Sequence, residues 1–383
     1  MTGGQSGRWA RFLVVADTLE PVVMTSGEHS RNRAATLPYV TGSALRGALA
    51  ARWLRNEGLL PGPGRKPEPI KDERRARFLT VFESGAVRFP FLYLSAPPPL
   101  SLHACKQEGA SHPLIDLADP RTHGAAGDDH KVRCPKCQGP IDRVGPAGPW
   151  HRDRPERRVK EVRTRTAIGD DGTAATAMLY AQEELLEGQR FHGTLKVRPD
   201  LLDLDGFTAM VPVGETFHVS VGADRSTSGQ IKVRITARPA EASHQSVAAR
   251  RAAWPCEGEL VLTACSPLLL TDQWLRPASR FSERLLQRLL GIEGLTIIRC
   301  TVARPRPVAG WNPGAGLPKP TDVALVEGSV ATLRLPEDHD PDTLLARLAE
   351  LEDQGIGWRR AEGFGEVTFW DSRHLDPLGA VDD

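Results

Sequence analysis

The chain has 383 residues, of which 40% are hydrophobic and 25% are charged, and its formal net charge is only +1. This length favours two or three domains, each large enough to bury its own core. The near-zero charge excludes a uniformly basic nucleic-acid-binding protein, so any basic surface must be local. The first apolar run, residues 12–16, is too short for an export signal or a membrane span, and six cysteines without such a signal do not predict a disulfide framework. We therefore expect a cytoplasmic protein without membrane contact.

A helix entry follows the opening strand, which we place at residues 11–19, and an irregular polar stretch at residues 25–36. Thr41 or Ser43 can cap this helix. Its apolar face is formed by Ala44, Leu45, Ala48, Leu49 and Trp53. Arg46 lies at the edge of that face, close to unpaired backbone N–H groups that favour an anion. The alternative is that Arg46 only covers the helix with its aliphatic stem.

A helix at residues 73–82 and a strand at residues 87–94 precede a segment of different character, residues 97–150. This segment has little apolar periodicity, is rich in Gly, Pro, Asp and His, and holds three of the six cysteines. We interpret it as an insertion that needs its own means of ordering, because it offers too few apolar side chains for a core.

A metal site is the predicted means of ordering. Cys134-Pro-Lys-Cys137 is a Cys-x-x-Cys knuckle, which points two thiolates at one ion. Cys105 is the natural third ligand, and His112 is the preferred fourth because its spacing leaves slack for a loop. The other candidates for the fourth position are His103, His123 and His130. The pattern predicts a closed, structural zinc site; a redox pair or inert thiols is the alternative.

Residues 152–185 are interpreted as a long hairpin with a basic stem. Its first part is rich in cations, namely Arg152, Arg154, Arg157, Arg158, Lys160, Arg163 and Arg165. It then passes through a Gly-Asp-Asp-Gly turn at residues 169–172 and ends in an acidic patch. The alternative is a charged face that is merely solvated.

The following segments are expected to repeat strand and helix. Residues 221–235 form a glycine loop that carries Arg225 and leads into an alternating strand. Residues 237–253 show no clear apolar periodicity and are interpreted as a linker. Beyond the linker we expect strands and one helix, at residues 259–270 (strand), 279–291 (helix), 296–305 and 323–335 (strands).

The last helix begins where Asp340 can cap it and ends at Gly355, which suits a helix C-cap. A loop with four glycines, Arg359 and Arg360 follows at residues 355–365, before a short final strand. Glycines let backbone N–H groups approach a ligand, and two guanidinium groups favour one rich in phosphate. No Gly-Lys-Ser/Thr ending is present, so this is not a nucleotide-triphosphate loop. The alternative is a helix cap and a tight turn with solvated arginines.

The order of elements occurs twice along the chain. Each half opens with a strand and closes with a glycine loop that carries arginine before a final strand. This repeat predicts two copies of one α+β domain. The lengths fit ferredoxin-like βαββαβ units, whose open antiparallel sheet commonly serves as an RNA platform.

Several segments resemble the RAMP superfamily of CRISPR effector proteins. Residues 37–47, Leu-Pro-Tyr-Val-Thr-Gly-Ser-Ala-Leu-Arg-Gly, resemble its Leu-Arg-Gly helix entry. Residues 259–270 resemble the strand that opens a RAMP domain, and residues 355–367 its C-terminal glycine-rich loop. Within the superfamily, the Cys/His insertion and three shorter segments look like the type III-D Csx-ten group, namely residues 164–168, 179–185 and 188–193.

The resemblance implies two ferredoxin-like (RRM-like) RAMP domains, at residues 1–245 and 255–372. The first would carry the zinc-binding insertion at residues 97–150 and, at residues 152–185, the β-hairpin known as the thumb. One departure concerns the first glycine loop, residues 221–232, which lacks the Arg-x-Gly-Phe-Gly core. RNA contact is therefore assigned chiefly to the second loop.

The resemblance also implies a non-catalytic subunit of an RNA-guided type III complex in antiviral defence. Such a subunit would bind the 5′ repeat-derived handle of the CRISPR RNA, meet target RNA only indirectly and stack against other subunits. Trp358 or Phe364 would stack a splayed base. The residues predicted to bind RNA are Ser43, Arg46, Arg157, Arg163, Arg165, Arg225, Trp358, Arg359, Arg360, Gly363, Phe364 and Gly365.

A metal-independent endoribonuclease is the main alternative, since related RAMP proteins process precursor CRISPR RNA. His29, in a segment with two arginines, is the best candidate base, and Asp17 or Glu28 are candidates for cleavage of target RNA. Nothing in the sequence pairs these side chains, so we predict the non-catalytic role. A zinc-containing RNA-binding protein outside any CRISPR complex is the third hypothesis.

Overall fold

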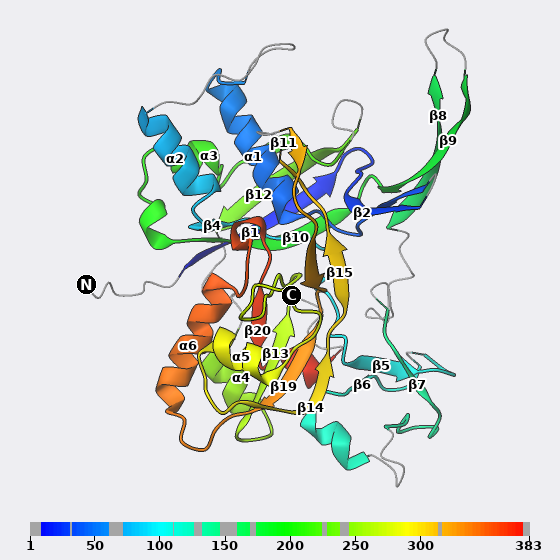
Figure 1. Ribbon diagram of the computed structural model, residues 1–383, viewed down its shortest axis with the longest axis vertical. Coiled ribbons are helices and arrows are strands. Elements are labelled where there is room, and N and C mark those ends of the chain that lie inside the picture. The colour runs from blue at the N-terminus through cyan, green and yellow to red at the C-terminus, as the bar shows by residue number, and fades with distance from the viewer. Residues whose placement is uncertain are drawn as a thin grey trace.

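The computed structural model describes residues 9–30, 33–60, 72–109, 111–125, 132–145, 159–168, 174–223, 228–237, 245–312 and 316–377. It is a mixed α/β structure with two principal antiparallel sheets, one from each half of the chain (Figure 1). No helix among these residues has the length and apolar character needed to cross a membrane.

The first sheet has the strand order β11-β12-β1-β10-β4. These strands are β1 (Ala10–Thr18), β4 (Val87–Arg88), β10 (Arg190–Val197), β11 (Thr216–Ser220) and β12 (Gln230–Ala237). Alternate residues of β1 face the core, which is completed by three helices, α1 (Gly42–Asn56), α2 (Asp72–Phe82) and α3 (Phe207–Met210). The three helices lie together beside this sheet (Figure 1). Without β11, the order is that of a ferredoxin-like unit with split βαβ crossovers.

The second sheet repeats this order as β14-β19-β13-β20. Along the chain, the strands of this sheet and the helices between them are β13 (Glu259–Ala264), α5 (Glu283–Leu290), β14 (Thr296–Val302), β19 (Val330–Arg334), α6 (Pro341–Gln354) and β20 (Val367–Phe369). Leucines of α5 and α6 pack on β13 and β19 in a second core. Both sheets thus have the strand order that the ferredoxin-like prediction requires. The domain boundaries at residues 245 and 255 stay predictions.

A third sheet, in the order β2-β3-β9-β8, carries a long hairpin that projects from the body of the molecule (Figure 1). Its strands are β2 (Thr25–Ser30), β3 (Arg33–Thr36), β8 (Lys160–Ile168) and β9 (Ala174–Leu185). The prediction of an irregular stretch at residues 25–36 was therefore wrong. β3 pairs in parallel with β9, about 150 residues away in sequence, and a local pattern cannot show such a partner.

The expected linker at residues 237–253 also needs correction, because residues 247–253 form helix α4 (Val247–Ala253). The Ser246 side chain caps it by accepting from the Ala249 N–H group. Arg250 is buried, where it donates to the Phe369 carbonyl and pairs with Glu352. Because a charged residue, Arg250, occupies a buried position of this helix, the sequence shows no apolar periodicity there.

Short elements complete the described fold. The insertion contributes a small sheet of β5 (Leu102–Cys105), β6 (Ile115–Asp116) and β7 (Ile141–Arg143). The 3-10 helix η1 (Pro120–Ala125) lies between β6 and β7 along the chain. The second half adds the paired strands β15 (Pro305–Val308) with β18 (Asp322–Leu325) and β16 (Trp311–Asn312) with β17 (Leu317–Pro318). Single turns of 3-10 helix are η2 (Pro199–Leu201), η4 (Arg360–Glu362) and η5 (Ser372–His374).

The two halves are joined by an apolar cluster and by ion pairs. The cluster consists of Tyr39, Phe91, Leu269, Ala324 and Phe364. Arg11 of β1 pairs with Asp353 of α6 at 2.6 Å, and Lys196 of β10 pairs with Glu366 at 2.9 Å. The start of β1 and the end of β10 therefore lie against the segment that contains the terminal glycine loop.

Candidate metal centre and nucleic-acid interface

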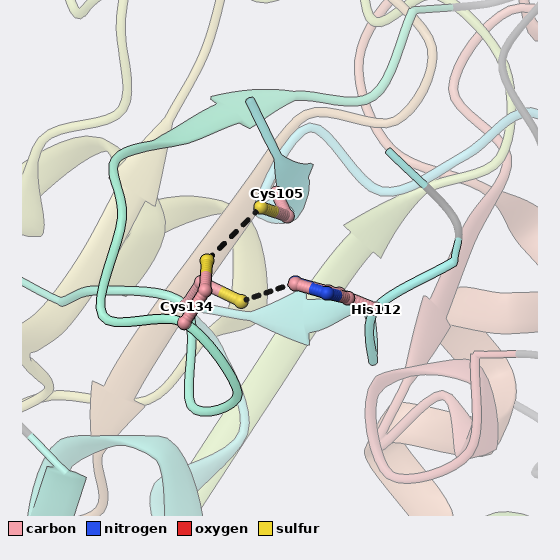
Figure 2. A group of neighbouring side chains, drawn as sticks. Cys105, His112 and Cys134 are labelled. Carbon is pink, nitrogen blue, oxygen red and sulfur yellow. Dashed lines mark hydrogen bonds between the residues drawn. The ribbon is translucent and has the colours of Figure 1, made fainter. Parts of the chain in front are cut away.

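The four predicted metal ligands come together in the structure. Cys105, His112, Cys134 and Cys137 place one ligand atom each within 4.8 Å of one another. The sulfur atoms of Cys105 and Cys137 are 3.5 Å apart, and His112 Nδ1 is 3.3 Å from the Cys134 sulfur. Figure 2 shows the side chains of Cys105, His112 and Cys134 converging from separate segments. Zinc–ligand bonds of about 2.0–2.3 Å in a tetrahedron require ligand atoms about 3.3–3.8 Å apart, so these two distances suit such an ion.

The local backbone shapes the knuckle for metal binding. The Cys134 N–H group donates to the Gly139 carbonyl, and the Gln138 N–H group donates to the Cys134 carbonyl. Gln138 has a positive φ of 58°. Burial of the Cys134 thiol opposes its ionisation, but N–H groups of Cys137 and Lys136 and the His112 ring lower its pKa to about 6. A thiolate is the form that binds metal, so this turn prepares Cys134 as a ligand.

His103, one of the alternatives for the fourth position, does not belong to this cluster. Its Nδ1 atom lies 2.7 Å from the Ser101 carbonyl. The preference for His112 is therefore consistent with the geometry.

The terminal glycine loop is built for close packing within the protein. Gly363 and Gly365 have φ values of 88° and 85°, and a Cβ on Gly365 would lie 2.0 Å from the Ile356 carbonyl. The N–H group of Gly365 donates to the Pro267 carbonyl, and that of Gly363 to the Arg360 carbonyl. The expectation that these N–H groups bind phosphate does not fit this arrangement, because both already have acceptors.

Phe364 and Arg359 also face inward. Phe364 is buried and packs edge to face against Phe91, with ring centroids 5.1 Å apart. Arg359 stacks over the Phe364 ring and pairs with Asp322 and Glu362 at 2.9 and 2.8 Å. Neither side chain is presented to a ligand, so the predicted stacking of Phe364 on a base and the predicted phosphate contact of Arg359 do not fit this placement.

Arg359→Ala is expected to lower the free energy of unfolding by about 1–3 kcal/mol, because buried Glu362 then loses one of the two cations that lie 2.8 Å from its carboxylate, the other being Lys319. The salt dependence of RNA binding should stay unchanged. Chemical denaturation measures the first effect, with Arg334→Ala as a control on an exposed arginine of β19. Normal stability with a flattened salt dependence would contradict the structural role.

Trp358 and Arg360, by contrast, line an open groove. Trp358 is 56% exposed, and its indole N–H donates to the Thr271 hydroxyl at 3.2 Å. Arg360 contacts the Gln354 and Gly355 carbonyls at the end of α6 but makes no ion pair within the described part of the chain. The groove has a volume of about 430 Å³.

Sequence reasoning missed two other arginines of this groove and one cation beside it. Arg288 of α5 and Arg347 of α6 also line the groove. Arg88 stacks over the Trp9 ring at 4.7 Å, and burial together with the charge of Arg360 lowers the pKa of Arg88 to about 9. Whether an arginine on a helix faces a groove depends on how that helix packs. The sequence alone therefore could not identify this surface.

The predicted helix entry packs directly on the glycine loop. A Cβ on Gly42 would lie 2.3 Å from the Glu362 carbonyl. Thr41 caps α1, and the Ser43 hydroxyl lies 3.1 Å from the Thr41 hydroxyl. Arg46 donates to the Phe82 carbonyl at 2.8 Å and lies 3.1 Å from Glu83. Two motifs far apart in sequence thus form one junction, in which Arg46 already has protein partners.

The described part of the projecting hairpin is less basic than its sequence suggests. Arg163 pairs with Glu161 at 2.6 Å and with Glu184 at 3.3 Å, and Arg165 pairs with Glu184. Arg157, Arg225 and the turn at residues 169–172 lie outside the described residues. The predicted contacts of Arg163 and Arg165 with RNA stay predictions, and each would compete with a carboxylate.

Of the candidates for catalysis, Asp17 has a described side chain. Asp17 accepts from Arg190 at 2.6 Å and pairs with Lys232 at 3.4 Å. The Arg190 hydrogen bond and the two positive charges lower the pKa of Asp17 against the opposing effect of burial. His29 lies on β2, and its side chain is outside the described residues.

No family model matches the chain, and no curated protein matches it. Solved structures similar to it include a chain of the type III-B Cmr-beta complex bound to cognate target RNA, with 15% identity, coverage of 84% of this chain and 86% of that chain, and a TM-score of 0.43. A Cas6 product complex has 13% identity, coverage of 94% and 99%, and a TM-score of 0.40. A type IV-B CRISPR complex has 13% identity, coverage of 62% and 93%, and a TM-score of 0.30. At TM-scores below 0.5 these likenesses carry no argument about the function of this chain.

Proposed function

We propose that the chain is a non-catalytic RNA-binding subunit of a type III CRISPR effector complex, a RAMP protein of the type III-D Csx-ten kind. It holds the 5′ repeat-derived handle of the CRISPR RNA and contacts neighbouring backbone subunits. The observation that carries the proposal is the groove at the terminal glycine loop, where exposed Trp358 lies with Arg288, Arg347 and Arg360. The repeated ferredoxin-like strand order and the junction of the helix entry with the loop support it.

The groove has the chemistry of a single-strand binding site. An exposed indole offers a stacking platform for any base, worth about 1–3 kcal/mol. Arg360 and Arg288 supply guanidinium groups for the phosphates on either side of that base. The glycines hold the loop in the conformation that presents Trp358, so their role in binding is indirect.

The hairpin of β8 and β9 is the proposed thumb. It projects from the body (Figure 1), and Val162 and Tyr180 on it are 49% and 40% exposed. Exposed apolar side chains on a projecting element suit contact with another subunit. Target RNA would meet the chain only through the paired guide. The metal of the insertion is proposed to be zinc, in a structural role.

Replacing Trp358 and Arg360 together with alanine is expected to weaken single-stranded RNA binding by about 10-fold to 100-fold. The slope of the logarithm of the binding constant against the logarithm of the salt concentration should decrease by about one, because a phosphate contact is lost. Fluorescence anisotropy at several salt concentrations measures both. Trp311→Ala with Arg75→Ala is the matched control, since it removes an exposed tryptophan and an exposed arginine that do not line the groove. Equal affinity and slope in the two double variants would contradict the proposal.

The guide-holding role is tested by purifying the protein with the products of its neighbouring genes and sequencing the RNA that accompanies it. Short RNAs that share one 5′ repeat-derived tag and crosslink to residues 355–365 are expected. RNA of random sequence would overturn the handle-binding role. Cleavage of RNA by the purified protein that is lost in His29→Ala or Asp17→Asn would establish the endoribonuclease instead.

A further inference from the structure

The first sheet has an outer face that no described helix of its own half covers. Side chains alternate along its strands, and Phe12, Val14 and Ala16 of β1 face the core with α1 and α2. The intervening residues point to the opposite side. The pairing register places Lys232 and Arg190 on either side of Asp17. Three strands thus bring charged side chains to the same place on the outer face.

A hollow of about 190 Å³ lies at this place. Its lining consists of Val15, Asp17, Arg190, Thr216, Lys232 and Arg234. Arg190 donates to both oxygens of Asp17, at 2.6 and 3.3 Å, and Lys232 lies 3.4 Å from the same carboxylate. Arg234 is exposed and makes no ion pair within the described residues. Three cations therefore surround one carboxylate, which leaves an excess of two positive charges.

The ion pairs in the hollow are of the exposed kind that another anion can displace. The side chains of Arg190 and Lys232 are 61% and 42% exposed. Exposed pairs contribute little to stability, because water and salt screen them. A backbone phosphate has two charged non-bridging oxygens, as a carboxylate does, and can bind two guanidinium groups at once. Arg234 is available for such a group without the loss of an existing ion pair.

One end of the outer face lies against the second half of the protein, next to the terminal glycine loop. At this end, Lys196 pairs with Glu366, which directly follows the terminal glycine loop. Arg11 on the same face pairs with Asp353 at the end of α6. From Arg11 to Asp17 the strand extends about 20 Å. This end of the outer face therefore lies beside the segment that contains the terminal glycine loop.

We infer that the hollow on the outer face binds a backbone phosphate of single-stranded RNA, with Arg190, Lys232 and Arg234 as its ligands and Asp17 as a built-in counter-ion that the phosphate displaces. This inference rests on the proposed RNA binding and extends it to a second contact. Asp17 then acts against RNA affinity, whereas a catalytic role would make it necessary for cleavage.

The test compares Asp17→Asn and Arg234→Ala with the unaltered chain in binding to a single-stranded RNA oligonucleotide. Asp17→Asn should bind about threefold to tenfold more tightly, because the cations lose a competing charge. Arg234→Ala should bind about threefold to tenfold more weakly, with a salt slope lower by about one. Asp200→Asn is the control for Asp17→Asn, since Asp200 also pairs with an arginine, Arg198, but does not line the hollow.

Arg75→Ala on α2 is the control for Arg234→Ala, because it removes one exposed arginine from the helical side. Equal gains in Asp17→Asn and Asp200→Asn would overturn the inference, since they would reflect net charge alone. Unchanged binding in Arg234→Ala, with weakened binding in the Trp358 and Arg360 variant, would overturn the inference and leave the proposed function intact. Absence of RNA binding by the unaltered chain would overturn both.

Discussion

Asp116→Ala is expected to lower the free energy of unfolding by about 3–5 kcal/mol, because it removes one partner from a buried ion pair. Asp116 Oδ2 lies 2.8 Å from His374 Nδ1, and the two side chains are 1% and 0% exposed. His374 Nε2 lies 2.7 Å from the buried Thr263 hydroxyl. The order of hydroxyl, imidazole and carboxylate is that of a hydrolase triad, but no substrate reaches groups so deeply buried. The chain of contacts is therefore structural.

This chain of contacts fastens the insertion to the second half of the protein. Asp116 belongs to β6 of the insertion, and Ala118, two residues later, packs in the core of the second half. Arg121 donates to the Leu375 carbonyl at 2.6 Å, close to His374 in sequence. Loss of Asp116 should consequently loosen both the insertion and η5. Differential scanning calorimetry measures the change, with Asp142→Ala, an exposed carboxylate of β7, as the control.

The pH dependence of stability distinguishes the contribution of the His374 charge from that of its hydrogen bonds. Burial opposes the charged His374 ring, but the Asp116 carboxylate and its hydrogen bond raise the pKa of His374 above the usual 6.5. A raised pKa in the folded state gives stability that is fully present below pH 6.5 and is lost as the pH rises through the folded value. Asp116→Asn keeps an acceptor for the Ala118 N–H group and should weaken this pH dependence, leaving the smaller contribution of Asp371. An unchanged pH profile in Asp116→Asn would show that the Asp116 charge does not raise the pKa of His374.

The sequence predicted the metal ligands because the necessary signal is local. A Cys-x-x-Cys turn places two thiolates by its own geometry, and few other Cys or His residues were available to complete the set. The anchoring of the insertion by Asp116 and His374 could not be predicted in this way. These residues lie 258 positions apart, and a buried histidine has no distinctive neighbours in sequence.

The glycine loop shows a different limit of sequence reasoning. Its position in the chain follows from a recognisable pattern, but the purpose of its glycines depends on which backbone lies opposite. Gly42 meets the Phe89 and Glu362 carbonyls, and Gly365 meets Ile356. Glycine that permits contact with a ligand and glycine that permits contact with distant backbone look the same in a sequence. The inward orientation of Arg359 and the outward orientation of Arg360 are likewise set by packing.

Cys134→Ser is expected to release the metal and to lower the melting temperature by about 5–10 °C. Cys134 is buried and lies within reach of His112, so its sulfur is central to the cluster. Among its described residues the insertion has a small apolar cluster of its own, with Leu102 and Val144 as its buried members. Without a metal the segment therefore lacks most of what holds it together. Metal analysis of the purified protein, followed by thermal denaturation, measures both effects.

Cys256→Ser is the matched control, because Cys256 is a free cysteine outside the cluster. A chelator should reproduce the effect of Cys134→Ser on the unaltered chain and should have little effect on the variant. The loss should extend to the second half, because β6 and η1 of the insertion dock there through Asp116 and Arg121. Hydrogen exchange at β13 and η5 should then increase, since Thr263 and His374 lose a fixed partner. Faster exchange confined to the insertion would show that the docking contacts hold without metal, and full metal content in Cys134→Ser would contradict the site itself.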